Sequence, residues 1–138
     1  MLGPTRPGPK NWSVSRWVPF IDMIGVRGID LSGATLLMQV RAYRDAPGAP
    51  LVNLANADPP AQGLSVSVVT ESGVPTSTIK IRINETTIEN LLPFPASGVE
   101  PGADVPLVWD LLVAKAGVVE KSRWFEGAFT IVPGVTQA

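Results

Sequence analysis

Most of the side chains that enzymes use for chemistry are absent from this chain. It has 138 residues, with no His, no Cys and a single Tyr, Tyr43. Without imidazoles or thiols it cannot form a Ser-His-Asp triad, a thiol nucleophile, a zinc finger or a haem-ligating imidazole. General acid–base chemistry would therefore have to come from carboxylates, lysines or Tyr43.

The remaining acid–base combinations have spacings that argue against catalysis. Asp110 lies in an expected strand, where solvent or a salt bridge would satisfy its carboxylate. A glycosidase-type pair of Asp110 with Glu120 or Glu126 would need carboxyl groups about 5 to 9 Å apart across a cleft. Lys121 and Ser122 are adjacent in a strand, so their side chains point to opposite faces and cannot form a dyad. We therefore expect no enzyme activity, no catalytic residue, no cofactor and no metal site.

Glycine and proline interrupt the chain too often for long helices. The chain has 13 Gly and 14 Pro, which excludes an all-α bundle. Short apolar stretches instead alternate with turn residues about every ten residues, as is typical of a β-sandwich. The expected strands are Ser13–Ile24, Ala34–Arg44, Leu51–Ala55, Leu64–Thr70, Thr76–Asn84, Leu107–Ala114, Val118–Glu126 and Ala128–Val132.

Several connections between these strands, and one strand irregularity, can be predicted in more detail. Pro19 indicates an edge position or a bulge in the first strand. Residues 25–28 are expected to form a turn, and Gly127 to separate the last two strands. Thr86 and Glu89 match a capping box that opens one helical turn near residues 86–92, before Pro93. The expected fold class is all-β, an antiparallel immunoglobulin-like β-sandwich of seven or eight strands, with a partly open barrel as the alternative.

The excess of proline divides the chain into an arm and one domain. Residues 1–11 are expected to form an extended Pro/Gly-rich arm, and residues 12–138 a single sandwich domain. A second Pro/Gly-rich stretch runs from Pro93 to Pro106. We expect no signal peptide and no membrane span, because no apolar window reaches about 18 residues.

Charge and aromatic residues suggest possible contact surfaces. The net charge is −1, but it is about +4 up to Arg44 and −5 beyond it. This asymmetry could steer self-association, or folding could mix the two parts and cancel it. Trp12 and Trp17 could anchor a partner or cap the core, and Trp109 is expected in the core. Nucleic-acid binding is not expected, because the sequence pI is about 5.3.

An ordered series of short motifs resembles small immunoglobulin-like virion domains of tailed bacteriophages and prophages, including the N-terminal domain of phage baseplate upper proteins. The series begins with Asp30-Leu31-Ser32-Gly33-Ala34-Thr35 and Met38-Gln39-Val40-Arg41. It continues with Ile81-Arg82-Ile83, Glu85-Thr86-Thr87, Trp109-Asp110-Leu111, Gly127-Ala128-Phe129 and Pro133-Gly134-Val135-Thr136. The proline-rich arm and the Pro93–Pro106 stretch depart from the family pattern. So does the end of the chain at Ala138, since baseplate upper proteins continue into fibre-forming segments.

The resemblance implies a non-enzymatic structural component of a phage virion, assembled in the host cytoplasm. It would be an adaptor or attachment domain in the tail, baseplate, fibre-attachment or neck region. Its partners would be other virion proteins and copies of itself. The alternatives are a capsid decoration protein, or a carbohydrate-binding module that uses Trp12, Trp17 and Trp124. The candidate partner-binding residues lie in the arm, the nearby tryptophans and the long loop: Pro4, Arg6, Pro7, Lys10, Trp12, Trp17, Phe94, Pro95 and Pro101.

Overall fold

Alternating apolar residues build nearly every strand of the computed structural model, which describes residues 8–90 and 102–134. Leu36, Met38 and Val40 of one strand, for example, are buried, while Leu37 and Gln39 between them are partly exposed. The elements are β1 (Gly8–Pro9), β2 (Trp12–Ser15), β3 (Phe20–Arg27), β4 (Thr35–Arg41), β5 (Val52–Ala55), β6 (Gly63–Glu71), β7 (Val74–Ile83), α1 (Glu85–Glu89), β8 (Val105–Ala114) and β9 (Ser122–Val132).

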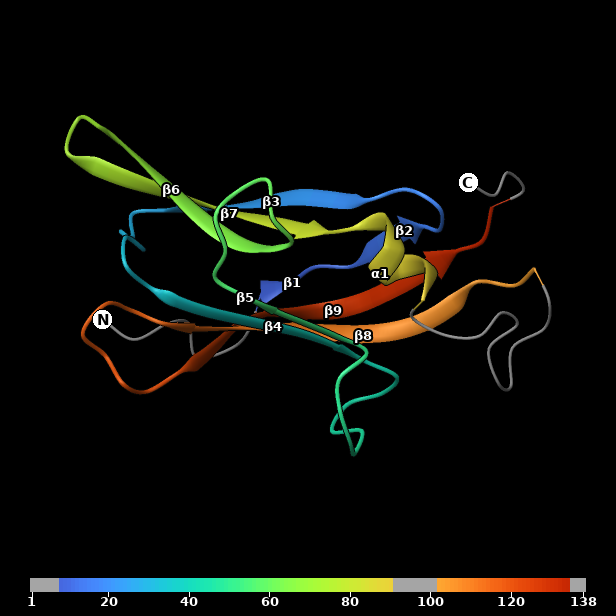
Figure 1. The fold of residues 1–138 in the computed structure, drawn as a ribbon. Helices are drawn as coiled ribbons and strands as arrows, with labels where there is room; N and C mark the ends of the chain where they lie inside the picture. Colours follow the sequence, from blue (N-terminus) through green and yellow to red (C-terminus); the bar gives the residue numbers. More distant parts are fainter. Residues whose placement is uncertain (1–7, 91–101, 135–138) are drawn as a thin grey trace.

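The strands form two sheets packed face to face (Figure 1). The larger sheet has the order β1-β9-β8-β4-β5, and β2 also pairs with β9. The smaller sheet has the order β3-β7-β6. Strands β1 and β2 run parallel to β9, whereas the other strand pairs are antiparallel. The β3-β7-β6 order matches strands B, E and D of an immunoglobulin-like sandwich, and β9-β8-β4-β5 matches G, F, C and C′. The expected fold class is therefore confirmed.

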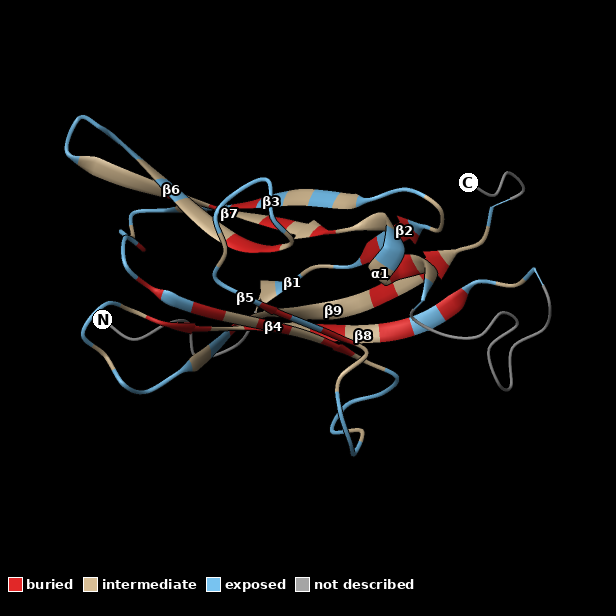
Figure 2. Cartoon of the chain, viewed as in Figure 1, coloured by how far each residue is buried: buried red, intermediate tan, exposed pale blue. Residues whose placement is uncertain are grey.

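The core fills the space between the two sheets. Buried positions lie on the strand faces that point toward each other (Figure 2). Full burial of one such aliphatic or aromatic side chain stabilises the fold by about 1.5 to 3 kcal/mol. The largest fully buried side chains include Phe129, Leu36, Met38, Leu54, Ile79, Ile81 and Leu111.

The first expected strand, Ser13–Ile24, is wrong as a single element, because β2 and β3 belong to different sheets. The chain crosses between the sheets at residues 16–19. Trp17 takes a φ of 75° there, a left-handed conformation that ends a strand, and Pro19 offers no N–H. The apolar pattern does not reveal this crossing, because both strands bury one face.

Two more expected boundaries are corrected by the strand pairing. Residues 25–27 are not a turn but the end of β3, and the turn begins at Gly28, which has a φ of 87°. The last strand starts at Ser122 rather than Val118 and runs unbroken through Gly127.

The expected capping box is also wrong. Asn84, not Thr86, occupies the N-cap of α1, and its side chain makes no capping hydrogen bond. The Gln62 side-chain oxygen accepts hydrogen bonds from the Asn84 N–H at 2.8 Å and from the Thr87 hydroxyl at 2.7 Å. A distant residue therefore accepts the N-cap N–H, which the Glu or Gln of a local capping box would otherwise accept. Residues 91 and 92 of the expected helical turn lie outside the described residues.

The end of the expected arm is part of the larger sheet. We call residues 8–15 the N-terminal strap, because they run along β9 over their whole length. The Lys10 N–H donates to the Glu126 carbonyl at 2.9 Å, and the Lys10 carbonyl accepts from Trp109 Nε1 at 2.9 Å. The Ala128 N–H donates to Asn11 Oδ1 at 2.9 Å. The folded domain thus begins by Gly8, and Met1–Pro7 of the expected arm lie outside the described residues.

Gly127 makes room for the strap at the point where the Lys10 carbonyl lies against β9. It pairs with Trp109 of β8, and a Cβ at this position would overlap the carbonyl group of Lys10. The close approach therefore requires glycine at this position for steric reasons.

We predict that Gly127→Ala lowers the free energy of unfolding by about 2 kcal/mol or more, because overlap with backbone forces the strap away from β9. Chemical denaturation followed by tryptophan fluorescence measures the change. Gly25→Ala is the matched control, since an added Cβ would meet no other atom within 4 Å there. Equal stability of the two variants would contradict the prediction.

Candidate partner-binding face

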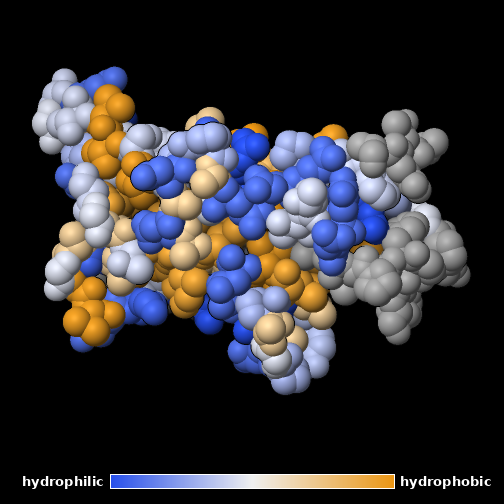
Figure 3. All heavy atoms as spheres, in the orientation of Figure 1, coloured by the Kyte–Doolittle hydropathy of each residue, from blue (hydrophilic) through white to orange (hydrophobic). Residues whose placement is uncertain are grey.

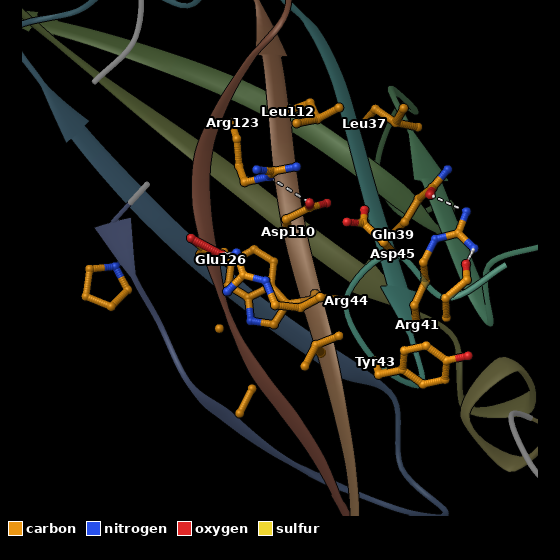
Figure 4. Close-up of a pocket in the computed structure, with 16 residues that line it drawn as sticks. Leu37, Gln39, Arg41, Tyr43, Arg44, Asp45, Asp110, Leu112, Arg123 and Glu126 are labelled. Atoms are coloured by element: carbon orange, nitrogen blue, oxygen red, sulfur yellow. Dashed lines mark hydrogen bonds and ion pairs between the residues drawn. The ribbon is translucent and has the colours of Figure 1, made fainter. Parts of the chain in front are cut away.

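The outer face of the larger sheet carries a hollow of about 730 Å³ (Figure 4). Its floor is formed by β4, β8 and β9, and residues 43–46 of the segment after β4 form one wall. Pro9 of the strap also lines it. This volume lies within the range of about 300 to 1,000 Å³ that is usual for binding sites.

Arg41 holds the wall of the hollow in place. Its Nη1 donates to the Ala46 carbonyl and to the Gly48 carbonyl, both at 2.8 Å, and its Nη2 donates to Gln39 Oε1 at 3.1 Å. Figure 4 shows the Arg41 guanidinium turned toward Gln39. Two charge-assisted hydrogen bonds fix the loop against the end of β4, and the third holds the guanidinium to Gln39 of the same strand.

The other charged groups of the hollow include two ion pairs. Arg44 contacts Glu126 at 2.6 Å, and Arg123 contacts Asp110 at 2.9 Å. Exposed pairs of this kind add little stability, but they leave both carboxylates engaged by a guanidinium. The salt-bridge alternative for Asp110 is therefore the one that the structure shows. The Arg44–Glu126 pair also joins the basic and acidic parts of the sequence, so folding offsets part of the charge asymmetry.

Apolar side chains lie between these pairs. Leu37, Val108 and Leu112 are partly exposed on the floor, and Tyr43 is 59% exposed on the wall. A mixed apolar and hydrogen-bonding surface with an exposed tyrosine is typical of a site that docks another protein. The described lining of the hollow thus combines apolar side chains with charged and amide groups.

Two carboxyl groups in the described ranges have displaced pKa values, and neither lines the hollow. Hydrogen bonds from Ser32, first its side chain and then its backbone, lower the pKa of Asp30. Desolvation, and then the neighbouring Glu85, raise the pKa of Glu89, while Arg16 opposes them.

Among residues 8–90 and 102–134, no group of three or more acidic side chains is placed to hold a metal ion. Within the same ranges, no helix is long and apolar enough to cross a membrane.

Three candidate partner-binding residues lie in the described ranges, and Lys10, Trp12 and Trp17 differ in burial and contacts. Trp12 is only 7% exposed, and its ring stacks on Trp109 with centroids 4.1 Å apart. The core alternative therefore holds for Trp12, and its role as an exposed partner anchor is wrong. Lys10 contributes its backbone to the strap. Trp17 is partly exposed, with the Arg16 guanidinium 5.2 Å from its ring centroid.

The remaining candidates lie outside the described residues. These are Pro4, Arg6, Pro7, Phe94, Pro95 and Pro101. The hollow itself was not among the predicted sites. The outward-facing Gln39 and Arg41 of one strand and Asp110 of another were a usable signal, but only the pairing of β4 with β8 brings them together.

Comparison of the chain with models of known protein families and with curated proteins gives no match. The resemblance to phage virion domains therefore rests on the motif series itself.

We predict that Trp109→Phe costs about 1 to 3 kcal/mol more stability than Trp12→Phe. Both changes shorten an aromatic side chain in the same stack, but only the first leaves the Lys10 carbonyl without its indole donor. The Trp12 Nε1–H has no hydrogen-bond partner among the described residues. Urea denaturation of both variants measures the difference, and equal losses would show that the Lys10 hydrogen bond does not stabilise the strap.

We predict that Arg41→Ala costs about 1 to 3 kcal/mol, because it releases the Ala46 and Gly48 carbonyls. Arg44→Ala is the control. It removes the same type of side chain from the same hollow, but its ion pair is 71% exposed on the arginine side and should contribute below about 1 kcal/mol. Thermal unfolding ranks the two variants, and a larger loss for Arg44→Ala would contradict the proposed role of Arg41.

Proposed function

We propose that this chain is a non-enzymatic structural domain of a tailed-phage particle, acting as an adaptor or attachment domain between neighbouring virion proteins. Its position would be the tail, baseplate, fibre-attachment or neck region, and it would join the virion during assembly in the host cytoplasm. Its partners would be other virion proteins and copies of itself.

The observation that carries this proposal is the parallel pairing of the first and last strands. β2 lies beside β9 from the Trp12–Phe129 pair to the Ser15–Val132 pair. Tension between the segments before Gly8 and after Gly134 would act along these strands in opposite directions. The hydrogen bonds between them would then be loaded together in shear rather than broken one at a time. Such resistance suits a domain that connects neighbours through its two ends.

The motif series supports the proposal because several of its residues build the sandwich. Asp30 Oδ1 accepts a hydrogen bond from the Ser32 N–H at 2.8 Å, and Gly33 has a φ of 74° in the turn before β4. The Leu31 N–H donates to the buried Ser77 hydroxyl at 2.9 Å. The motifs shared with virion domains therefore include residues that form turns and hydrogen bonds in this sandwich.

The hollow offers such an adaptor a docking surface beside the strap. Its loop is fixed by Arg41, so little ordering entropy would be lost when a partner binds. A capsid decoration protein would use the same features. The carbohydrate-binding alternative loses most of its aromatic platform, because Trp12 and Trp124 are 7% and 2% exposed, leaving only Trp17 of the three.

We predict that deletion of residues 1–7 leaves a folded protein that fails to enter particles. The cut is placed at Pro7, because deletion through Asn11 would also remove the Lys10 and Asn11 contacts with Glu126, Trp109 and Ala128. Particles assembled with full-length or truncated chain are compared by immunoblot, and unfolding midpoints are measured in parallel.

Deletion of residues 1–11 is the control for this experiment, since we expect it to lower the unfolding midpoint as well. Normal incorporation of the protein that lacks residues 1–7 would contradict attachment through these residues. Binding of the isolated protein on a glycan array, together with its absence from particles, would instead favour the carbohydrate-binding alternative.

A further inference from the structure

Strand β6 is the least protected edge in the described part of the two sheets. Proteins usually guard a sheet edge with prolines, charges or a very short strand. β2 and β5 have only four residues each, and β1 contains Pro9. β3 points the charged Asp22 toward the interior side of its sheet. β6, in contrast, has nine residues and no proline, and its first charged residue is Glu71 at the end.

The free edge of β6 has a defined set of backbone groups. The two-residue turn of Ser72 and Gly73 makes Glu71 and Val74 a hydrogen-bonded pair. By alternation, the N–H and C=O groups of Thr70, Val68 and Val66 then point away from β7. The Leu64 carbonyl follows the same rule, since it accepts the Ala57 N–H at 2.9 Å on that side.

The segment beyond Leu64 is open to solvent. The β6–β7 hairpin projects beyond the body of the sandwich (Figure 1), and hydrophobic atoms gather on this projecting end (Figure 3). Val69 is 59% exposed there. A hollow of about 390 Å³ lies beside residues 64–67 and extends to residues 56–59, which leaves room next to Ser65.

We propose that β6 binds β6 of a second copy in antiparallel orientation, forming a two-fold symmetric dimer with one continuous sheet. With Val68 on the symmetry axis, Val68 pairs with the partner's Val68, and Val66 pairs with the partner's Thr70. This register uses the three residues whose backbone groups face the edge. It also leaves the Leu64–Ala57 hydrogen bond intact. A two-fold interface of this kind is self-complementary and closed.

Charge supports a second copy as the occupant. On the outer face of the sheet Ser65 pairs with Lys80 of β7, and Glu71 lies on the same face. In the proposed register Glu71 lies opposite the partner's Ser65. The small serine lets the carboxylate approach the partner's Lys80 on the next strand. The symmetry creates this acid–base contact twice, once on each side of the axis.

The test is the oligomeric state of the full chain, measured by sedimentation across a range of concentrations. The wild type is expected to form a concentration-dependent dimer. Glu71→Lys places two positive charges near each other at both contacts and should weaken the dimer roughly tenfold or more. Adding Lys80→Glu reverses both charges and should restore the dimer. Glu120→Lys makes the same charge change in the loop before β9 and should leave dimerisation unchanged.

A second variant tests the backbone pairing. Val68→Pro removes an N–H that faces the edge and that β7 does not use, so the folded monomer should persist while the dimer is lost. Circular dichroism checks the fold. A wild type that stays monomeric overturns the proposal, even if it captures an unrelated strand peptide. So does a dimer that survives Val68→Pro or a charge reversal that fails to restore it. The proposal does not depend on the virion role, since particle incorporation and solution dimerisation are measured separately.

Discussion

The position of one backbone carbonyl organises the larger sheet. The Lys10 carbonyl lies against Gly127 of β9 and accepts a hydrogen bond from the Trp109 indole N–H. The Ala128 N–H, which would otherwise lose its partner, donates to the Asn11 side chain. This arrangement is possible only because Gly127 has no Cβ beneath the strap. The contacts of residues 10–11, 109 and 127–128 thus depend on the close approach of the strap to β9.

The consequence of this contact extends into the core. Once the strap is fixed at Lys10, the next residues continue along β9 and deliver the Trp12 ring onto the Trp109 ring, with Phe20 and Phe129 around it. The same residues that close one edge of the sheet therefore complete the aromatic end of the core. This coupling explains why residues 8–11 belong to the folded domain despite their proline and glycine content.

Local periodicity was sufficient to predict most of the sandwich, and non-local contacts account for the errors. The alternation of Leu36, Met38 and Val40 identified a half-buried strand, because it reflects the pleat of that strand alone. The helix cap could not be predicted, because the partner of the N-cap N–H is Gln62, which precedes β6 and lies beside Asn84 only once β6 and β7 pair. A glycine between two apolar stretches predicts a break at Gly127, because the local pattern does not show the strap. Its role depends on a strap more than a hundred residues earlier in the chain.

The two sheets expose different kinds of groups to solvent. The larger sheet is therefore suited to docking at the hollow, and the smaller sheet to strand pairing at β6. The outer face of the larger sheet is already ordered by Arg41 and by two ion pairs, so a partner there would meet a preformed surface. The edge of β6 instead presents backbone N–H and C=O groups that β7 does not use, and a second strand can pair with them. A partner on the outer face of the larger sheet and a second copy at the β6 edge would not compete, because the two surfaces belong to different sheets. The fold therefore allows self-pairing and attachment to a neighbour in the same molecule.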